Sequence, residues 1–238
     1  MNVEVSHLVV NGCSYSYCFN LENPKENGWP ALLANKLNVP IVNLSETGSS
    51  NDAILRRSLE YFHKDKKTNS KPLYIIGWTG STRREEYYRD LNETLFVSLK
   101  TENNPFEKFL VEQLCTEAFV YYEQKKLMYW SSLIDLCKLN NIPYVMTDFI
   151  PFLETERQLL QERFPEFYDY VINDYYNLPN VRDSMYDNKD KYLMQCGHYN
   201  KEGNKVLADF FYDEILKRYT IEPTEKEYYK IQKNNDWS

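Results

Sequence analysis

The chain has 238 residues, of which 42 % are hydrophobic and 26 % charged, as is ordinary for a folded globular protein. A chain of this length forms one large domain, or a domain with a small appendage, and buries a core without disulfides or metal ions. The formal net charge of −7 argues against general binding to nucleic acids or anionic membranes, because both need a basic surface. We therefore expect no nucleic-acid partner and no membrane partner.

The cysteines and the N-terminal stretch bear on the cellular compartment. Five cysteines occur without a CxxC pair and without zinc-site spacing, which favours reduced, mostly buried thiols. The first residues, MNVEVSHLVV, contain an early Glu and no basic region, so no secretory signal is predicted. No apolar run approaches the ~20 residues of a membrane span. Together these features predict a cytoplasmic protein.

Apolar β-type runs alternate with helical patterns along the chain. In chain order, strands are predicted at 8–10, 39–45, 71–79 and 142–149, and helices at 29–37, 50–63, 106–139 and 200–219. Such alternation favours a parallel sheet that helices cover on both faces. We expect an α/β fold, a three-layer α/β/α doubly wound domain with a mainly parallel sheet of about five strands. The strand at 8–10 should be central.

Three segments carry weaker patterns. Residues 82–105 are polar and predicted as a loop with an irregular helix, and residues 151–191 as short helices with loops. Residues 221–238 are polar and charged, which is typical of a loosely packed tail. Because no internal repeat or low-complexity linker occurs, we expect a single domain over residues 1–220 followed by that tail.

Polar residues follow the predicted strands, and in an open parallel sheet ligands collect at the carboxyl ends of the strands. Small residues, a hydroxyl, backbone amides at helix starts and a histidine are the parts that acyl transfer needs. No glycine-rich phosphate loop and no HExxH motif occurs, so we expect no cofactor and no metal. The polar stations are Gly12-Cys13-Ser14, then Gly48 to Asn51, then Thr79 with Arg83 and Glu85, and finally His198.

At these stations the sequence resembles the SGNH, or GDSL-like, hydrolase superfamily. The resemblance rests on "NGCSYS", on Gly48 in "NLSETGSSN" and on "GHYNKEGNKVLADFF", in the family's order over roughly residues 7–218. It implies an SGNH-type (flavodoxin-like) fold and a serine esterase or deacylase that acts on a small-molecule or carbohydrate ester. It also implies Ser14 as the nucleophile and His198 as the catalytic histidine.

Two departures from the family pattern concern the third and last blocks. Thr79 stands where the third block normally supplies an asparagine. The family's aspartate, two or three residues before the histidine, is replaced by Cys196 and Gln195. The orienting group for the histidine is then expected to be Gln195, or Asp187 or Asp190 returning from upstream, or a backbone carbonyl.

The resemblance assigns a role to each station. Ser14 would attack a carbonyl carbon after its proton passes to His198, whose unperturbed pKa of ~6.5 suits a base near neutral pH. The backbone amides of Ser14 and Gly48 would bind the oxyanion, and Thr79 or Arg83 would complete the hole. Arg83 is alternatively suited to gripping a substrate carboxylate or phosphate. Asn51 and Glu85 are the other substrate-binding candidates.

Each station also has a purely structural interpretation. Ser14 fits a turn residue, Gly48 a turn glycine and His198 a cap of the last helix, while Ser16 competes as the exposed hydroxyl. Cys13 is more typical of buried packing than of a nucleophile, and the charges around Arg83 are typical of a solvated helix face. Two other functions therefore stay open: a catalytically impaired SGNH-fold binding module, and a doubly wound protein with a Tyr-rich face for a protein partner.

Overall fold

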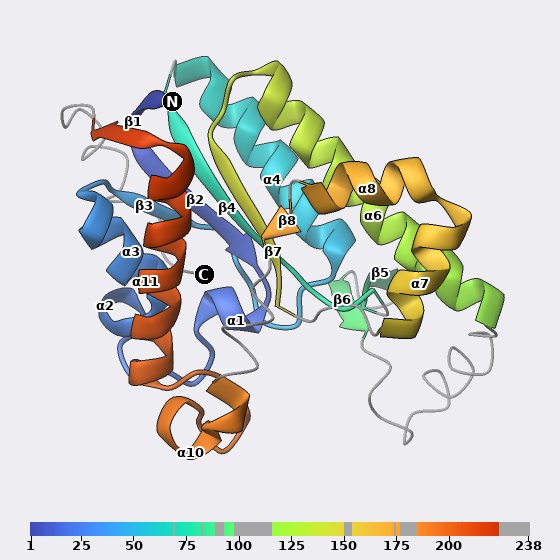
Figure 1. The fold of residues 1–238 in the computed structure, drawn as a ribbon. Helices are drawn as coiled ribbons and strands as arrows, with labels where there is room; N and C mark the ends of the chain where they lie inside the picture. Colours follow the sequence, from blue (N-terminus) through green and yellow to red (C-terminus); the bar gives the residue numbers. More distant parts are fainter. Residues whose placement is uncertain are drawn as a thin grey trace.

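A computed structural model describes residues 1–68, 70–81, 83–88, 93–97, 116–149, 154–173, 175–176 and 185–223. Its centre is a five-stranded parallel sheet with the order β3-β2-β4-β7-β8 (Figure 1). The strands are β2 (His7–Gly12), β3 (Ile41–Asn43), β4 (Pro72–Trp78), β7 (Tyr144–Asp148) and β8 (Tyr175–Tyr176). The predicted parallel sheet of about five strands is therefore confirmed.

Strand β2, which contains the predicted first run, lies inside the sheet between β3 and β4. The middle position itself belongs to β4, so β2 is internal without being the central strand. Every residue of β2 and of β4 is buried. Continuous burial is what parallel strands show when both faces of the sheet are covered.

Helices cover both faces of the sheet and complete three layers. Helices α3 (Trp29–Leu37) and α11 (Lys201–Arg218) lie on one face, and α4 (Asn51–Asp65) and α6 (Thr116–Leu139) lie on the other (Figure 1). Side chains on the two faces of β2 belong to two different apolar cores. Leu8 and Val10 belong to the core on the α3 and α11 side, whereas Val9 belongs to the core with residues of α4 and α6.

The remaining helices lie beside these layers or at the ends of longer elements. Helices α7 (Glu154–Arg163) and α8 (Pro165–Asn173) contribute Leu160, Tyr168 and Val171 to the core beside α6. The short helices α1 (Ser14–Tyr17), α2 (Pro24–Asn27) and α10 (Lys189–Tyr192), with the 3-10 turn η1 (Lys66–Thr68), lie at the ends of longer elements. Short helices in the predicted segment 151–191 are thus confirmed, but its two-residue strand β8 is too short to leave a pattern.

Two predictions about the weaker segments were wrong in part. Strands β5 (Arg84–Tyr88) and β6 (Glu93–Val97) form an antiparallel pair where a loop with an irregular helix was expected. Their Tyr, Phe, Thr and Val residues suit a strand, and the two short runs pair only with each other. The first ten residues of the predicted helix 106–139, and residues 98–105, lie outside the described residues.

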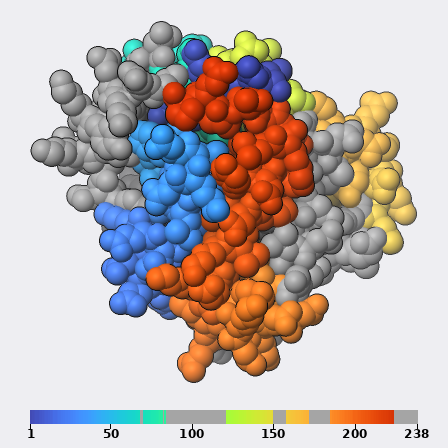
Figure 2. All heavy atoms as spheres, turned by 60° about the vertical axis from the view of Figure 1, so that its left-hand side comes forward, coloured from blue at the N-terminus to red at the C-terminus, as the bar shows by residue number. Residues whose placement is uncertain are grey.

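The predicted tail begins as a strand. Strand β9 (Thr220–Pro223) pairs in parallel with β1 (Asn2–Val5), which the sequence analysis did not predict, in a separate two-stranded sheet. Figure 2 shows these two chain segments together above α11 and α3. Val3 stands opposite Ile221, and both pack against the core on the α11 side. The rest of the expected tail, residues 224–238, lies outside the described residues.

None of the helices within these described ranges is long and apolar enough to cross a membrane.

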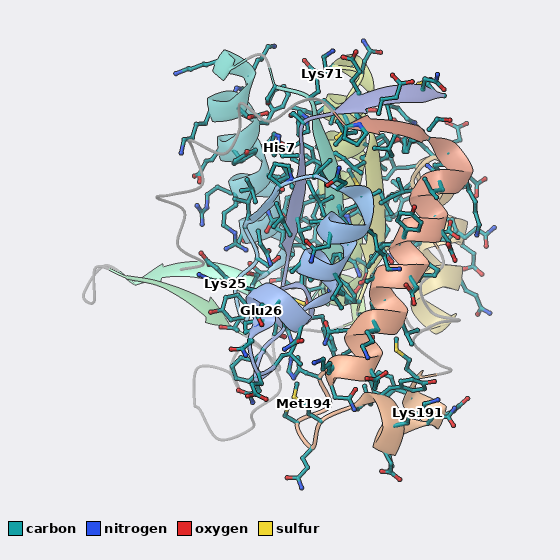
Figure 3. The ribbon with its side chains drawn as sticks, turned by 90° about the vertical axis from the view of Figure 1, so that its left-hand side faces the viewer. His7, Lys25, Glu26, Lys71, Lys191 and Met194 are labelled. Atoms are coloured by element: carbon teal, nitrogen blue, oxygen red, sulfur yellow. The ribbon has the colours of Figure 1, made fainter. Side chains whose placement is uncertain are left out.

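His7 lies at the end of the sheet opposite to the predicted site, and Figure 3 shows it far from Met194 of the loop before α11. The ring is fully buried, with Nδ1 2.9 Å from the Ser6 hydroxyl and Nε2 2.9 Å from the Tyr61 hydroxyl. Burial lowers the pKa of His7 to about 4, although the Asp65 carboxylate acts in the opposite direction. The folded protein therefore holds this ring neutral.

The free energy of unfolding should fall as the pH falls from about 6.5 to about 4. In this range His7 binds a proton in the unfolded chain but stays neutral in the folded protein. The effect is at most about 3 kcal/mol, and His7 contributes no pH dependence above that window. Urea unfolding at pH 7, 5.5 and 4.5 measures it. In His7→Gln the loss across the window should shrink; an unchanged loss would contradict the assignment to His7.

Candidate active site

Ser14 is the first residue of α1, directly beyond the end of β2. Cys13 before it is extended, and the N–H of a first helical residue has no acceptor within its own helix. The strand end is fixed by buried Asn11, which accepts from the Gly12 N–H (2.9 Å) and donates to the Ile54 carbonyl (2.8 Å) of α4. Ser14 therefore follows a strand end that hydrogen bonds hold in place. Its exposed fraction is 7 %.

His198 lies in the loop before α11 and reaches Ser14. Its Nε2 is 2.8 Å from Ser14 Oγ, within the range that proton transfer to a base requires. The ring centroid lies 4.9 Å from that of Tyr15 and 5.4 Å from that of Phe19, so two aromatic rings fix its plane. The Met194 N–H also donates to the His198 carbonyl (2.7 Å). The geometry suits a nucleophile and its base, while their catalytic roles stay a prediction.

Asn204 of α11 ties this loop to the rest of the site, and the sequence analysis missed it. The residue is 1 % exposed. Its Oδ1 accepts from the Trp29 N–H (3.0 Å) and the Cys18 thiol (3.3 Å), and its Nδ2 donates to the carbonyls of Tyr199 (3.0 Å) and Asn200 (2.9 Å). Its position on the buried face of α11, three residues before Leu207, was the signal available in the sequence.

The loop after β3 is held by Arg57 of α4, another residue that the sequence analysis missed. This guanidinium donates to Glu46 Oε2 (2.6 Å) and to Ser49 Oγ (2.6 Å), on either side of Gly48. Gly48 is exposed and has a φ of 76°, which glycine tolerates best. It stands three residues before the first residue of α4. Its place in an oxyanion hole stays a prediction.

Thr79 and Asn51 are joined by two hydrogen bonds. Asn51 Oδ1 accepts from the Thr79 N–H (2.9 Å), and Asn51 Nδ2 donates to the Thr79 carbonyl (2.9 Å). The Thr79 hydroxyl is buried and has no hydrogen-bond partner among the described residues. Since Gly12 and Gly77 are paired across β2 and β4, Ser14 and Thr79 each stand two residues beyond that pair. The hydroxyl, not the backbone amide, is thus the Thr79 donor that remains.

Arg83 follows a turn closed by its N–H to the Gly80 carbonyl (3.2 Å). It is half-buried and lines a small cavity with Asn51. Its Nη1 is buried and finds no acceptor in the described part of the chain. Glu85 itself lies in β5, and its side chain is outside the described residues.

The three predicted orienting groups, Gln195, Asp187 and Asp190, are all exposed. None of their side chains forms a hydrogen bond with His198. Asp190 and Gln195 instead line a surface groove of about 540 Å³ beside the His198 loop. Their assignment as orienters therefore has no support in the geometry.

Burial and helix capping decide between the structural and the catalytic interpretations of Ser16, Cys13 and His198. Ser16 is fully buried against Gly12 and Gly77, so it is not an exposed competitor of Ser14. Cys13 is fully buried too, which favours the packing interpretation. His198 does not cap α11, because the N-cap is Asn200, whose Oδ1 accepts from the Gly203 N–H (3.0 Å).

The described cysteines are free thiols: Cys13, Cys18 and Cys137 are buried, and Cys196 is exposed. Burial raises the pKa of Cys18 and of Cys137 to about 12, so both stay neutral at physiological pH. No group of three or more His, Cys, Asp or Glu side chains is placed to hold a metal ion among the described residues.

A family model described as a family of unknown function, DUF6071, matches residues 19–113. No curated protein matches the sequence. The structure is similar to that of esterase EstA from Pseudoalteromonas sp., solved inhibited by monoethylphosphonate, with 15 % identity, a TM-score of 0.53, and coverage of 89 % of this chain and 97 % of that one.

Two other solved structures are similar over comparable lengths. TesA is 16 % identical, with a TM-score of 0.50 over 89 % of this chain and 98 % of its own. An alpha/beta hydrolase enzyme from the metagenome of Lake Arreo, Spain, is 14 % identical, with a TM-score of 0.50 over 90 % and 96 %. At these identities the likeness concerns the fold alone: this chain has an SGNH-like α/β fold, as its sequence motifs implied.

Proposed function

We propose that the protein is a serine hydrolase of the SGNH type, an esterase or deacylase that acts on a small ester or on the O-acyl group of a carbohydrate. The 2.8 Å distance between Ser14 Oγ and His198 Nε2 is the observation that carries the proposal. Neutral His198 accepts the Ser14 proton while Oγ attacks the ester carbonyl. The protonated ring then donates to the leaving alcohol, which leaves an acyl group on Ser14.

The second half-reaction uses the same two residues in reverse. His198 takes a proton from water, the resulting hydroxide attacks the acyl carbonyl, and the proton returns to Ser14 as the acid leaves. The N–H groups of Ser14 and Gly48 and the hydroxyl of Thr79 are the proposed donors to the oxyanion of both tetrahedral intermediates. The unpartnered state of the Thr79 hydroxyl supports its place among them.

Hydrolysis of p-nitrophenyl acetate tests the proposal. The wild-type protein should release p-nitrophenol above the rate of buffer, and Ser14→Ala should not. Ser16→Ala is the matched control, because Ser16 Oγ is buried and has no hydrogen-bond partner among the described residues. Equal turnover by Ser14→Ala and the wild type would overturn the proposal, and no turnover by either would favour the binding module.

We also propose a cytoplasmic, reducing location. The free thiol state of the described cysteines supports it, since buried unpaired thiols persist in reducing compartments.

A further inference from the structure

A small polar cavity lies between the first turn of α4, the segment after β4 and α6. Its volume is about 30 Å³. Room of this size holds a water-sized polar group or two, and is too small for a ring or a long acyl chain. The lining includes Asn51, Ser81, Arg83, Lys125, Lys126 and Tyr129.

Arg83 brings an unsatisfied guanidinium to this cavity. Its Nη1 is shielded from solvent, and within the described residues no group accepts a hydrogen bond from it. A buried N–H without an acceptor is unfavourable, all the more on a charged group. The planar fork of a guanidinium matches the oxygens of a carboxylate or phosphate.

Both cations and carboxylates surround the cavity. Lys126 and Asp148 form an ion pair in which both side chains are at most 2 % exposed, so the charge of Lys126 is balanced. Burial works against the charge of Lys125, but its hydrogen bond with Tyr129 and the nearby Asp52 carboxylate raise its pKa. Arg83 and Lys125 share the lining with the Asp52 carboxylate, and buried Glu123 lies behind it, where its Oε1 accepts from the hydroxyl of the lining Ser81.

The cavity is linked to the reacting residues through Asn51. Its side chain lines the cavity and holds the backbone of Thr79 by two hydrogen bonds of 2.9 Å. Thr79 follows β4, the immediate neighbour of the strand that leads to Ser14. Neighbouring strands lie about 5 Å apart, so the backbone that Asn51 holds is next to the strand that positions Ser14.

We propose that this cavity binds an anionic oxygen group of the substrate, so that the substrates are small esters that carry a carboxylate or a phosphate. The inference rests on the proposed function, because it assigns the substrate class of the same site. Arg83 binds the anion through its fork, and Lys125 adds a second positive charge.

The test compares acidic esters with a neutral ester of the same shape. The acidic substrates are 4-acetoxybenzoate and 4-acetoxyphenyl phosphate, and the neutral one is methyl 4-acetoxybenzoate. A charge-assisted pair contributes about 1.5–3 kcal/mol, so the wild type should prefer at least one acidic ester by about tenfold or more in kcat/KM. Which of the two is preferred separates a carboxylate site from a phosphate site.

The same preference should fall by about tenfold in Arg83→Gln and less in Arg83→Lys, which keeps the charge but not the fork. Arg56→Gln is the matched control, since Arg56 is exposed on α4 and pairs with Glu60. It should keep the wild-type preference. No preference in the wild type, or an equal preference in Arg83→Gln, would overturn the inference, while Ser14-dependent hydrolysis of the neutral ester would leave the hydrolase proposal standing.

Binding gives a second readout that needs no turnover. Isothermal titration of the wild type with benzoate and, separately, with inorganic phosphate should detect at least one anion, bound about tenfold more weakly by Arg83→Gln and unchanged in Arg56→Gln. Failure of the wild type to bind either anion, or equal binding by Arg83→Gln, would refute the anion site whether or not the protein hydrolyses esters.

Discussion

Replacing His198 by alanine should lower kcat for p-nitrophenyl acetate by about 10⁴-fold or more, and Ser14→Ala should do the same. The physical reason is the 2.8 Å contact between Ser14 Oγ and His198 Nε2. A serine hydroxyl is a weak nucleophile, and it needs a base at this distance to lose its proton as it attacks. Steady-state hydrolysis by the purified variants measures the effect.

The double variant separates a working pair from two independent contributions. Residues that act as one unit are strongly non-additive, so Ser14→Ala with His198→Ala should be no slower than either single variant. Thermal unfolding controls for loss of structure, because the His198 ring packs on Tyr15 and Phe19. If the double variant is well folded and its loss of kcat equals the product of the two single losses, Ser14 and His198 do not act in one shared step.

Asn204→Ala should lower the free energy of unfolding by about 4 kcal/mol or more, the largest stability effect expected here. It removes the four hydrogen bonds that join α11 to Trp29, Cys18 and the His198 loop, at about 1 kcal/mol each. Truncation also leaves the Trp29 N–H buried without an acceptor, which adds to the loss. Urea unfolding followed by tryptophan fluorescence measures the change.

Asn140→Ala is the matched control for Asn204→Ala. The Asn140 side chain donates only to the Leu136 carbonyl at an exposed helix end, so its loss should change the free energy of unfolding by less than about 1 kcal/mol. Equal, small effects of both substitutions would show that Asn204 is not an anchor of the loop.

The sequence was sufficient to predict the layers of the fold because the signals were local and strong. Apolar runs such as Leu8–Val10 are long enough to mark buried strands, and Ser50, which caps α4, marks a helix start. The expectation that Ser14 and His198 lie together followed from the same pattern, since carboxyl ends of parallel strands share one edge. This is how Ser14 and His198, 184 residues apart, were expected to meet.

What failed in the prediction depended on contacts distant in sequence. Strand β9 exists because it pairs with β1 at the other end of the chain, and its own polar residues give no strand pattern. The orienting roles given to Gln195, Asp187 and Asp190 rested on spacing alone, and these side chains point to solvent. The link between Asn51 and the Thr79 backbone likewise needs the folded chain.

The most direct test of the central claim is the reaction of the protein with a fluorophosphonate, followed by intact mass and peptide mapping. EstA, whose fold is similar, was solved inhibited by a phosphonate. An activated serine here should take up one phosphonyl group, on Ser14, and the label should be lost in Ser14→Ala, greatly slowed in His198→Ala and retained in Ser16→Ala. No labelling of the folded wild type, or a label on another residue, would contradict the account.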